Sequence, residues 1–161
     1  MGNFYTDVLS QDPRFGSVDR ISDMALLEPV TALAVQNLIQ AAAGMGFPVT
    51  VFETYRSQAR QQMLFTQGAT KLQKVGVHGY GLAADLVRVV AGEPTWKVDY
   101  SFLGPLAKQY RLVWGGDWAA PGVAHSFVDS DHVQRIAVAK QNDLFAGVWY
   151  PDPSYAAGVL G

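Results

Sequence analysis

An apolar run from Leu82 to Val90 contains one carboxylate, Asp85. The run is rich in β-branched residues and predicts a strand. An ionised carboxylate without a partner would be costly inside such a strand. The fold must therefore bring a compensating group to Asp85, and a metal ion is one such group.

His78 lies seven residues before Asp85 and is followed by Gly79 and Gly81. On an uninterrupted strand, an odd separation points two side chains to opposite faces. The chain must turn between His78 and Asp85 if both are to reach one ion, and the two glycines permit such a turn. The alternative is a loop histidine beside an aspartate that faces solvent from an edge strand.

A second acidic segment, Asp129-Ser-Asp-His132, supplies the remaining donors. The chain has no cysteine and only three histidines, so a metal site must use His, Asp and Glu. Together with His78 and Asp85, His132 would give the three protein ligands of a catalytic zinc site, with water in the fourth position. Asp129 is a candidate for the general base that takes the proton of that water. The alternative is an acidic turn that leads into a strand.

Composition excludes several classes of function. The formal net charge is −2, with 12 basic and 14 acidic residues, so the basic footprint of a nucleic-acid binder is absent. The lack of cysteine excludes disulfides and cysteine nucleophiles. The sequence contains no run of about 20 apolar residues, which is the length needed to span a membrane. The first residues lack the basic and apolar regions of a signal peptide.

The chain of 161 residues predicts one domain, with a core over 28–138, an irregular lead-in over 1–22 and an irregular tail over 151–161. Residue spacing predicts helices over 29–44, 57–68 and 101–110, and strands over 48–55, 82–90, 112–114 and 132–138. A polar segment over 67–74, a turn over 92–94 and a loop over 119–126 separate them. Helices and strands without βαβ regularity favour an α+β fold.

The two His and Asp segments together resemble the peptidase M15 family. This family includes D-alanyl-D-alanine carboxypeptidases and phage L-alanyl-D-glutamate endolysins. Its pattern is Ser-x-His, six residues, Asp, and later an acidic residue, two residues and His. Here the pattern reads Gly76-Val-His78, Asp85 and Asp129-Ser-Asp-His132.

Three further stretches resemble the endolysin branch of that family. They are Thr54-Tyr-Arg-Ser57, Gly79-Tyr-Gly-Leu-Ala-Ala-Asp85 and Trp114-Gly-Gly-Asp-Trp118. The resemblance covers residues 28 to 138 with order and spacing intact. It implies a small antiparallel sheet flanked by helices, with zinc at one face of the sheet, as in hedgehog and D-Ala-D-Ala peptidases.

The resemblance also implies roles for individual residues. His78, Asp85 and His132 match the zinc ligands, and Asp129 matches the acidic residue that acts as base. Arg56 matches an arginine that holds a substrate carboxylate, a role suited to its planar fork; the alternative is a surface arginine that caps a strand. The residues that could line a substrate groove, or alternatively brace the site, are Tyr55, Trp114, Asp117 and Trp118.

Two positions depart from the family pattern. Gly76 stands where the family has serine, so any support from that hydroxyl is missing. His125 lies near the second segment but matches no ligand position. We interpret His125 as a loop or rim residue rather than a fourth ligand.

These expectations converge on zinc-dependent hydrolysis of a peptide bond in the peptidoglycan stem peptide, with L-alanyl-D-glutamate as the expected bond. One alternative is a D,D-carboxypeptidase that trims terminal D-alanine. Another, of a different class, is an inactive wall-binding or virion structural module. By family analogy, we expect a monomeric protein made in the cytoplasm that reaches the wall through a holin-like pore or with a virion.

Overall fold

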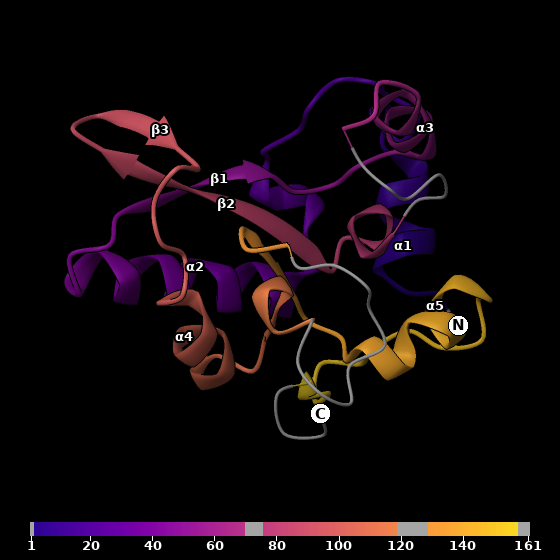
Figure 1. The fold of residues 1–161 in the computed structure, drawn as a ribbon. Coiled ribbons are helices and arrows are strands. Elements are labelled where there is room, and N and C mark those ends of the chain that lie inside the picture. The colour runs from indigo at the N-terminus through magenta and orange to yellow at the C-terminus, as the bar shows by residue number, and fades with distance from the viewer. Residues whose placement is uncertain (1, 70–75, 119–128, 158–161) are drawn as a thin grey trace.

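The computed structural model describes residues 2–69, 76–118 and 129–157 (Figure 1). Its strands form one antiparallel sheet in the order β1-β2-β5-β4, with β3 also paired to β2. The strands are β1 (Val49–Glu53), β2 (Ala83–Val90), β3 (Glu93–Thr95), β4 (Val113–Trp114) and β5 (His132–Gln134). The α-helices are α1 (Phe4–Asp7), α2 (Pro29–Gly44), α3 (Gln58–Thr66), α4 (Leu103–Gln109) and α5 (Gln141–Phe145). The predicted α+β class, a small antiparallel sheet with flanking helices, is confirmed.

The long helix α2 covers one face of the sheet together with α4, below β1 and β2 in Figure 1. Glu28 caps α2 because its carboxylate accepts hydrogen bonds from the N–H groups of Val30 and Thr31. Proline at the first helical position fits there because no intrahelical N–H bond is lost. The buried side chains of this core include Val35, Leu38, Ala84, Leu86, Leu103, Leu106 and Val133.

The opposite face of the sheet carries a row of polar side chains. Ala84 and Leu86 of β2 belong to the apolar core, so Asp85 between them points to the other face. Asp85 pairs directly with Glu53 of β1 on one side and with His132 of β5 on the other. We call Glu53, Asp85 and His132 the polar row; all three are buried.

A β-bulge in β1 decides which residue enters the polar row. Val51 pairs with Leu86, but the next pair along is Glu53 with Asp85, so Phe52 is the extra residue. A bulge of this kind redirects the side chains that follow it. In a regular ladder, Phe52 would stand opposite Asp85 and Glu53 would point to the other face of the sheet.

The predicted turn between His78 and Asp85 is a 3-10 helix, η3 (Val77–Tyr80), that ends at Gly81. Gly81 has a φ of 73°, in the left-handed region that glycine adopts without strain. A Cβ at Gly81 would lie 3.1 Å from the Leu26 carbonyl oxygen and 3.0 Å from the Phe4 ring. Both the conformation and the close packing therefore require glycine at this position.

Several boundaries differ from the sequence prediction. The lead-in contains α1 and a 3-10 turn at Leu9–Gln11, which bury Leu9. The turn predicted over 92–94 lies at Ala91 and Gly92, which both adopt positive φ and close a two-residue hairpin, and β3 already begins at Glu93. The last strand ends at Gln134 rather than 138.

The helices also show two differences. α4 begins at Leu103, ahead of Pro105, since proline is tolerated within a first helical turn. The sequence interpretation missed the short helix α5.

The predicted loop over 119–126 and most of the polar segment over 67–74 lie outside the described residues. No helix in the described part of the chain is long and apolar enough to cross a membrane.

Replacement of Gly81 tests how tightly this turn is constrained. We expect Gly147→Ala to lower the free energy of unfolding by about 1 kcal/mol, because Gly147 has a similar φ of 74° with nothing within 4 Å of its Cβ position. Gly81→Ala should cost about 1–3 kcal/mol more, because the added methyl overpacks the contacts above. Urea unfolding curves measure both. Equal losses would show that packing at Gly81 is unimportant.

Candidate metal centre

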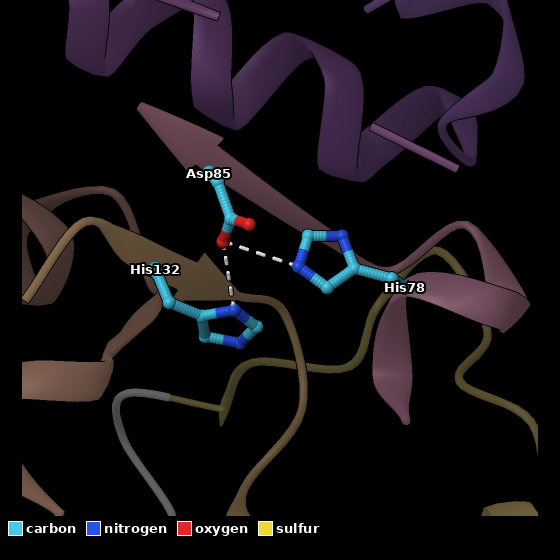
Figure 2. Close-up of side chains that lie close together, drawn as sticks. All are labelled: His78, Asp85 and His132. Atoms are coloured by element: carbon cyan, nitrogen blue, oxygen red, sulfur yellow. Dashed lines mark hydrogen bonds and ion pairs between the residues drawn. The ribbon is translucent and has the colours of Figure 1, made fainter. Parts of the chain in front are cut away.

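One oxygen of Asp85 faces both imidazole rings (Figure 2). Oδ1 lies 3.1 Å from Nε2 of His78 and 3.2 Å from Nδ1 of His132. The ligand atoms of these three residues all lie within 4.8 Å of one another. Each of the three residues is at most 7% exposed. The structure thus brings together the three predicted ligands from η3, β2 and β5, and two imidazoles with a carboxylate are a donor set that zinc accepts.

Hydrogen bonds on the outer side of His78 favour one tautomer. Nδ1 lies 2.8 Å from the backbone carbonyl of Thr54. A carbonyl oxygen can only accept, so Nδ1 carries the hydrogen and donates it. The lone pair then resides on Nε2, the nitrogen that faces Asp85. Such outer contacts commonly orient histidine ligands of metals.

His132 is oriented in the same way through Gln134. Nε2 of His132 lies 2.9 Å from Oε1 of Gln134. The amide nitrogen of Gln134 donates to the carbonyl of Ile136 at 2.8 Å and to Oε1 of Gln141 at 3.0 Å. Its oxygen therefore accepts from Nε2 of His132, which leaves the Nδ1 lone pair directed at Asp85.

The second oxygen of Asp85 is bound by Arg56. Nη2 of Arg56 donates to Oδ2 of Asp85 at 3.1 Å and to Oε1 of Glu53 at 2.9 Å. Oε2 of Glu53 accepts from Nε of Arg60 at 2.6 Å. Asp85 therefore divides its oxygens, with Oδ2 on the arginine and Oδ1 on the histidines. Charge-assisted bonds of this kind are shorter and stronger than neutral ones.

Electrostatics keeps both buried carboxylates of the polar row ionised. Burial alone would raise the pKa of Asp85, but when the two imidazoles are protonated their charges and hydrogen bonds hold that pKa well below its usual value. In the neutral tautomers described above, Arg56 is the positive group that remains bonded to Asp85. Burial likewise opposes ionisation of Glu53, yet Arg56 and Arg60 lower its pKa. An ionised Asp85 is the form that can bind a cation.

Asp129, the predicted base, lies at the edge of this centre. Its Oδ2 is 4.0 Å from Nδ1 of His132, and its side chain is 40% exposed. The neighbouring Asp131 is more enclosed, and burial, with the charges of Asp85 and Asp129 added, raises the pKa of Asp131 to about 9. Asp129 is thus the more accessible of the two carboxylates.

The segment Trp114 to Trp118 braces the turn that carries Asp129. The indole N–H of Trp114 donates to the carbonyl of Ser130 at 2.7 Å. Gly115 accepts from the N–H of Asp129 at 3.0 Å, and a Cβ at Gly115 would lie 2.2 Å from the Asp129 carbonyl oxygen. The Trp118 ring packs on His132, with centroids 4.9 Å apart. These contacts match the bracing alternative.

The remaining residues that the sequence singled out differ in burial and position. Tyr55 is 2% exposed and donates its hydroxyl hydrogen to the carbonyl of Phe15, so its side chain belongs to the core. Asp117 is exposed on η4 (Gly115–Asp117). Gly76 precedes η3 and has no side chain with which to cap it. His125 lies outside the described residues.

Arg56 was expected to bind a carboxylate of the substrate. The structure supplies carboxylates from the chain itself, Glu53 and Asp85, and the Arg56 side chain is only 14% exposed. The alternative of a surface arginine is wrong, because burial and two ion pairs fix the guanidinium inside the site. A substrate carboxylate would have to share Arg56 with these two partners.

Two residues of the centre were missed in the sequence. Glu53 lies inside the strand predicted over 48–55, and a charge among its apolar and β-branched residues was a usable signal. Gln134 follows His132 by two residues in a strand, which puts both side chains on one face. Neither signal identifies the partners that Glu53 and Gln134 contact across the sheet, because those partners depend on pairing between strands far apart in the sequence.

The chain is similar to characterised proteins, although no family model matches it. It is 28% identical over 142 residues to the peptidoglycan L-alanyl-D-glutamate endopeptidase CwlK of Bacillus subtilis. The match covers 74% of this chain and 81% of CwlK.

Solved structures share the fold. The L-Ala D-Glu endopeptidase ChiX of Serratia marcescens matches with a TM-score of 0.57 and 22% identity, over 73% of this chain and 90% of ChiX. The D,D-pentapeptidase VanY in complex with Zn(II) matches with a TM-score of 0.52 and 15% identity, over 74% of this chain and 78% of VanY. The LD-carboxypeptidase LdcB matches with a TM-score of 0.55 and 17% identity, over 75% of this chain and 71% of LdcB.

Glu53 tests the outer contacts of the centre. We expect Glu53→Gln to weaken Zn²⁺ binding by about 10–100-fold, because Arg56 loses the carboxylate that holds it against Asp85. Competition with a chromophoric chelator measures the affinity. Glu28→Gln is the matched control, since Glu28 is also buried and ion-paired, to Arg135 at 3.0 Å, but has no bond to the three candidate ligands. Equal zinc affinities in the two variants would contradict a role for Glu53.

Proposed function

We propose that this chain is a zinc-dependent peptidase of peptidoglycan, on the premise that its relative and structural neighbours indicate the M15 peptidase family. The observation that carries the proposal is the meeting of three donor atoms: Nε2 of His78, Oδ1 of Asp85 and Nδ1 of His132. Each donor is held from behind by a hydrogen bond, as expected of a site built for a metal ion.

The chain's own residues divide the catalytic work. His78, Asp85 and His132 would hold the ion, which when bound would polarise the scissile carbonyl and acidify a water molecule. Asp129 is exposed enough to meet a water molecule at this edge of the centre, and it would accept the proton of that water and deliver it to the leaving amine nitrogen. Arg56 would keep Asp85 in place through its bond to Oδ2.

The bond that we propose is L-alanyl-D-glutamate, within the stem peptide. This choice follows CwlK, which matches the larger part of this chain by sequence and acts as an L-alanyl-D-glutamate endopeptidase. A carboxypeptidase that removes a terminal D-alanine is the second candidate, because VanY and LdcB share the fold. A role in phage-type lysis, with release through a pore, rests on the sequence resemblance alone.

Digestion of purified sacculi tests the proposal. We expect the zinc-loaded protein to solubilise wall material and to expose new amino groups of D-glutamate, and we expect a chelator to stop the reaction until Zn²⁺ is restored. Mass spectrometry of muropeptides, prepared with a muramidase from treated and untreated sacculi, separates the two candidates. Loss of a terminal D-alanine from sacculi that stay insoluble would select the carboxypeptidase, whereas muropeptides identical to those of untreated sacculi would reject both.

Asp129→Asn tests the base. We expect turnover to fall by about 10²–10⁴-fold, because the amide cannot accept the proton, while zinc stays bound. Elemental analysis and kinetics on a soluble stem peptide measure the two quantities. Asp143→Asn is the control, since Asp143 is an exposed aspartate on α5 and is not a candidate site residue. Unchanged turnover in Asp129→Asn would remove this residue from the mechanism.

A further inference from the structure

A hollow of about 330 Å³ adjoins the candidate metal centre. Its lining residues are Trp96, Tyr100, Asp129, Ser130 and Asp131. Asp129 is the proposed base, so any group that fills the hollow lies within reach of it. Trp96 is the largest of these side chains, and nothing in the sequence had marked it as part of the site.

Trp96 is held in one orientation but left open to solvent. Its side chain is 49% exposed, although an indole is large and apolar. The indole N–H donates to Oδ2 of Asp131 at 3.2 Å. The ring also meets Phe52 edge to face, with centroids 5.0 Å apart. A tryptophan that served only packing would bury most of its area; here both anchors fix the ring while an apolar surface remains available.

The backbone connects Trp96 to the site from two directions. Trp96 directly follows β3, which pairs with β2, the strand of Asp85. Asp131, which anchors the indole, directly precedes His132. Phe52 is the bulge residue of β1, so the same bulge that turns Glu53 into the polar row leaves Phe52 to support Trp96.

We propose that Trp96 forms one wall of the substrate groove and contacts the stem peptide beside the scissile bond. The inference rests on the proposed function, because it takes the peptide as the occupant. The open indole offers an apolar face to aliphatic side chains and to the peptide backbone. Asp129 in the same hollow favours the peptide over the glycan strand, because the base must stand beside the amide that is cut.

Binding measurements test this role separately from catalysis. The parent protein carries Asp129→Asn, is loaded with zinc and is titrated in a calorimeter with a soluble stem peptide that contains an L-alanyl-D-glutamyl bond. We expect Trp96→Ala to raise the dissociation constant about tenfold, as for loss of a well-placed aromatic contact. Trp96→Phe keeps an aromatic face but loses the N–H, so we expect a smaller loss, about threefold.

Two controls separate binding from folding. Phe145→Ala removes another exposed aromatic, 40% exposed on α5 and outside the hollow, and should leave the dissociation constant unchanged. Zinc content and circular dichroism should be the same in all variants. In proteins that retain Asp129, Trp96→Ala should raise KM about tenfold with kcat within about twofold, because the contact is made equally in the ground and transition states.

The outcomes distinguish this inference from the proposed function. If the Asp129→Asn parent binds the peptide through Trp96 but the protein that retains Asp129 cleaves no wall material, the proposed peptidase activity is rejected. The role of Trp96 in peptide binding is then retained. Equal dissociation constants for the parent and Trp96→Ala, or no binding by the parent, would overturn the role of Trp96. If Trp96→Ala does not fold, an unchanged dissociation constant in both Trp96→Phe and Trp96→Leu would overturn it as well.

Discussion

The shared contact of Asp85 Oδ1 with two imidazole nitrogens is the interaction on which the rest of the site depends. Asp85 lies between Ala84 and Leu86 of the apolar core and is itself only 7% exposed, so its charge has little access to bulk water. An unpaired carboxylate there would be too costly for a stable fold. The surrounding structure therefore serves to satisfy this one group, and the same arrangement creates a binding place for a cation.

The sheet itself assembles the compensation. Antiparallel pairing puts Glu53 and His132 on either side of Asp85, so two carboxylates and one imidazole lie in one row. Arg56 links Glu53 to Asp85, and the bonds behind His78 and His132 select the nitrogens that face inward. Preorganisation of this kind lowers the reorganisation needed when an ion binds, because the donors already point to one place.

The sequence predicted which three residues meet at the centre better than it predicted the residues that support them. Asp85 within an apolar run and the glycine after η3 are local signals, so the turn, the strand and the α+β class could be derived. The bulge at Phe52 could not, because it depends on the register of β1 against β2, and a shift of one residue exchanges the two faces. The bond between Arg56 and Asp85 and the anchoring of Trp96 by Asp131 were hidden for the same reason, because each joins segments far apart in the sequence.

Diffraction at the zinc absorption edge, from crystals grown with about one equivalent of Zn²⁺, tests the central claim most directly. The account predicts one anomalous peak, coordinated by Nε2 of His78, Oδ1 of Asp85 and Nδ1 of His132, with Oδ2 of Asp85 still on Arg56. The nearby acidic group of Asp85, Asp129 and Asp131 offers a competing place for a cation. A peak held by that group without the histidines, or by Nε2 of His132, would contradict the account.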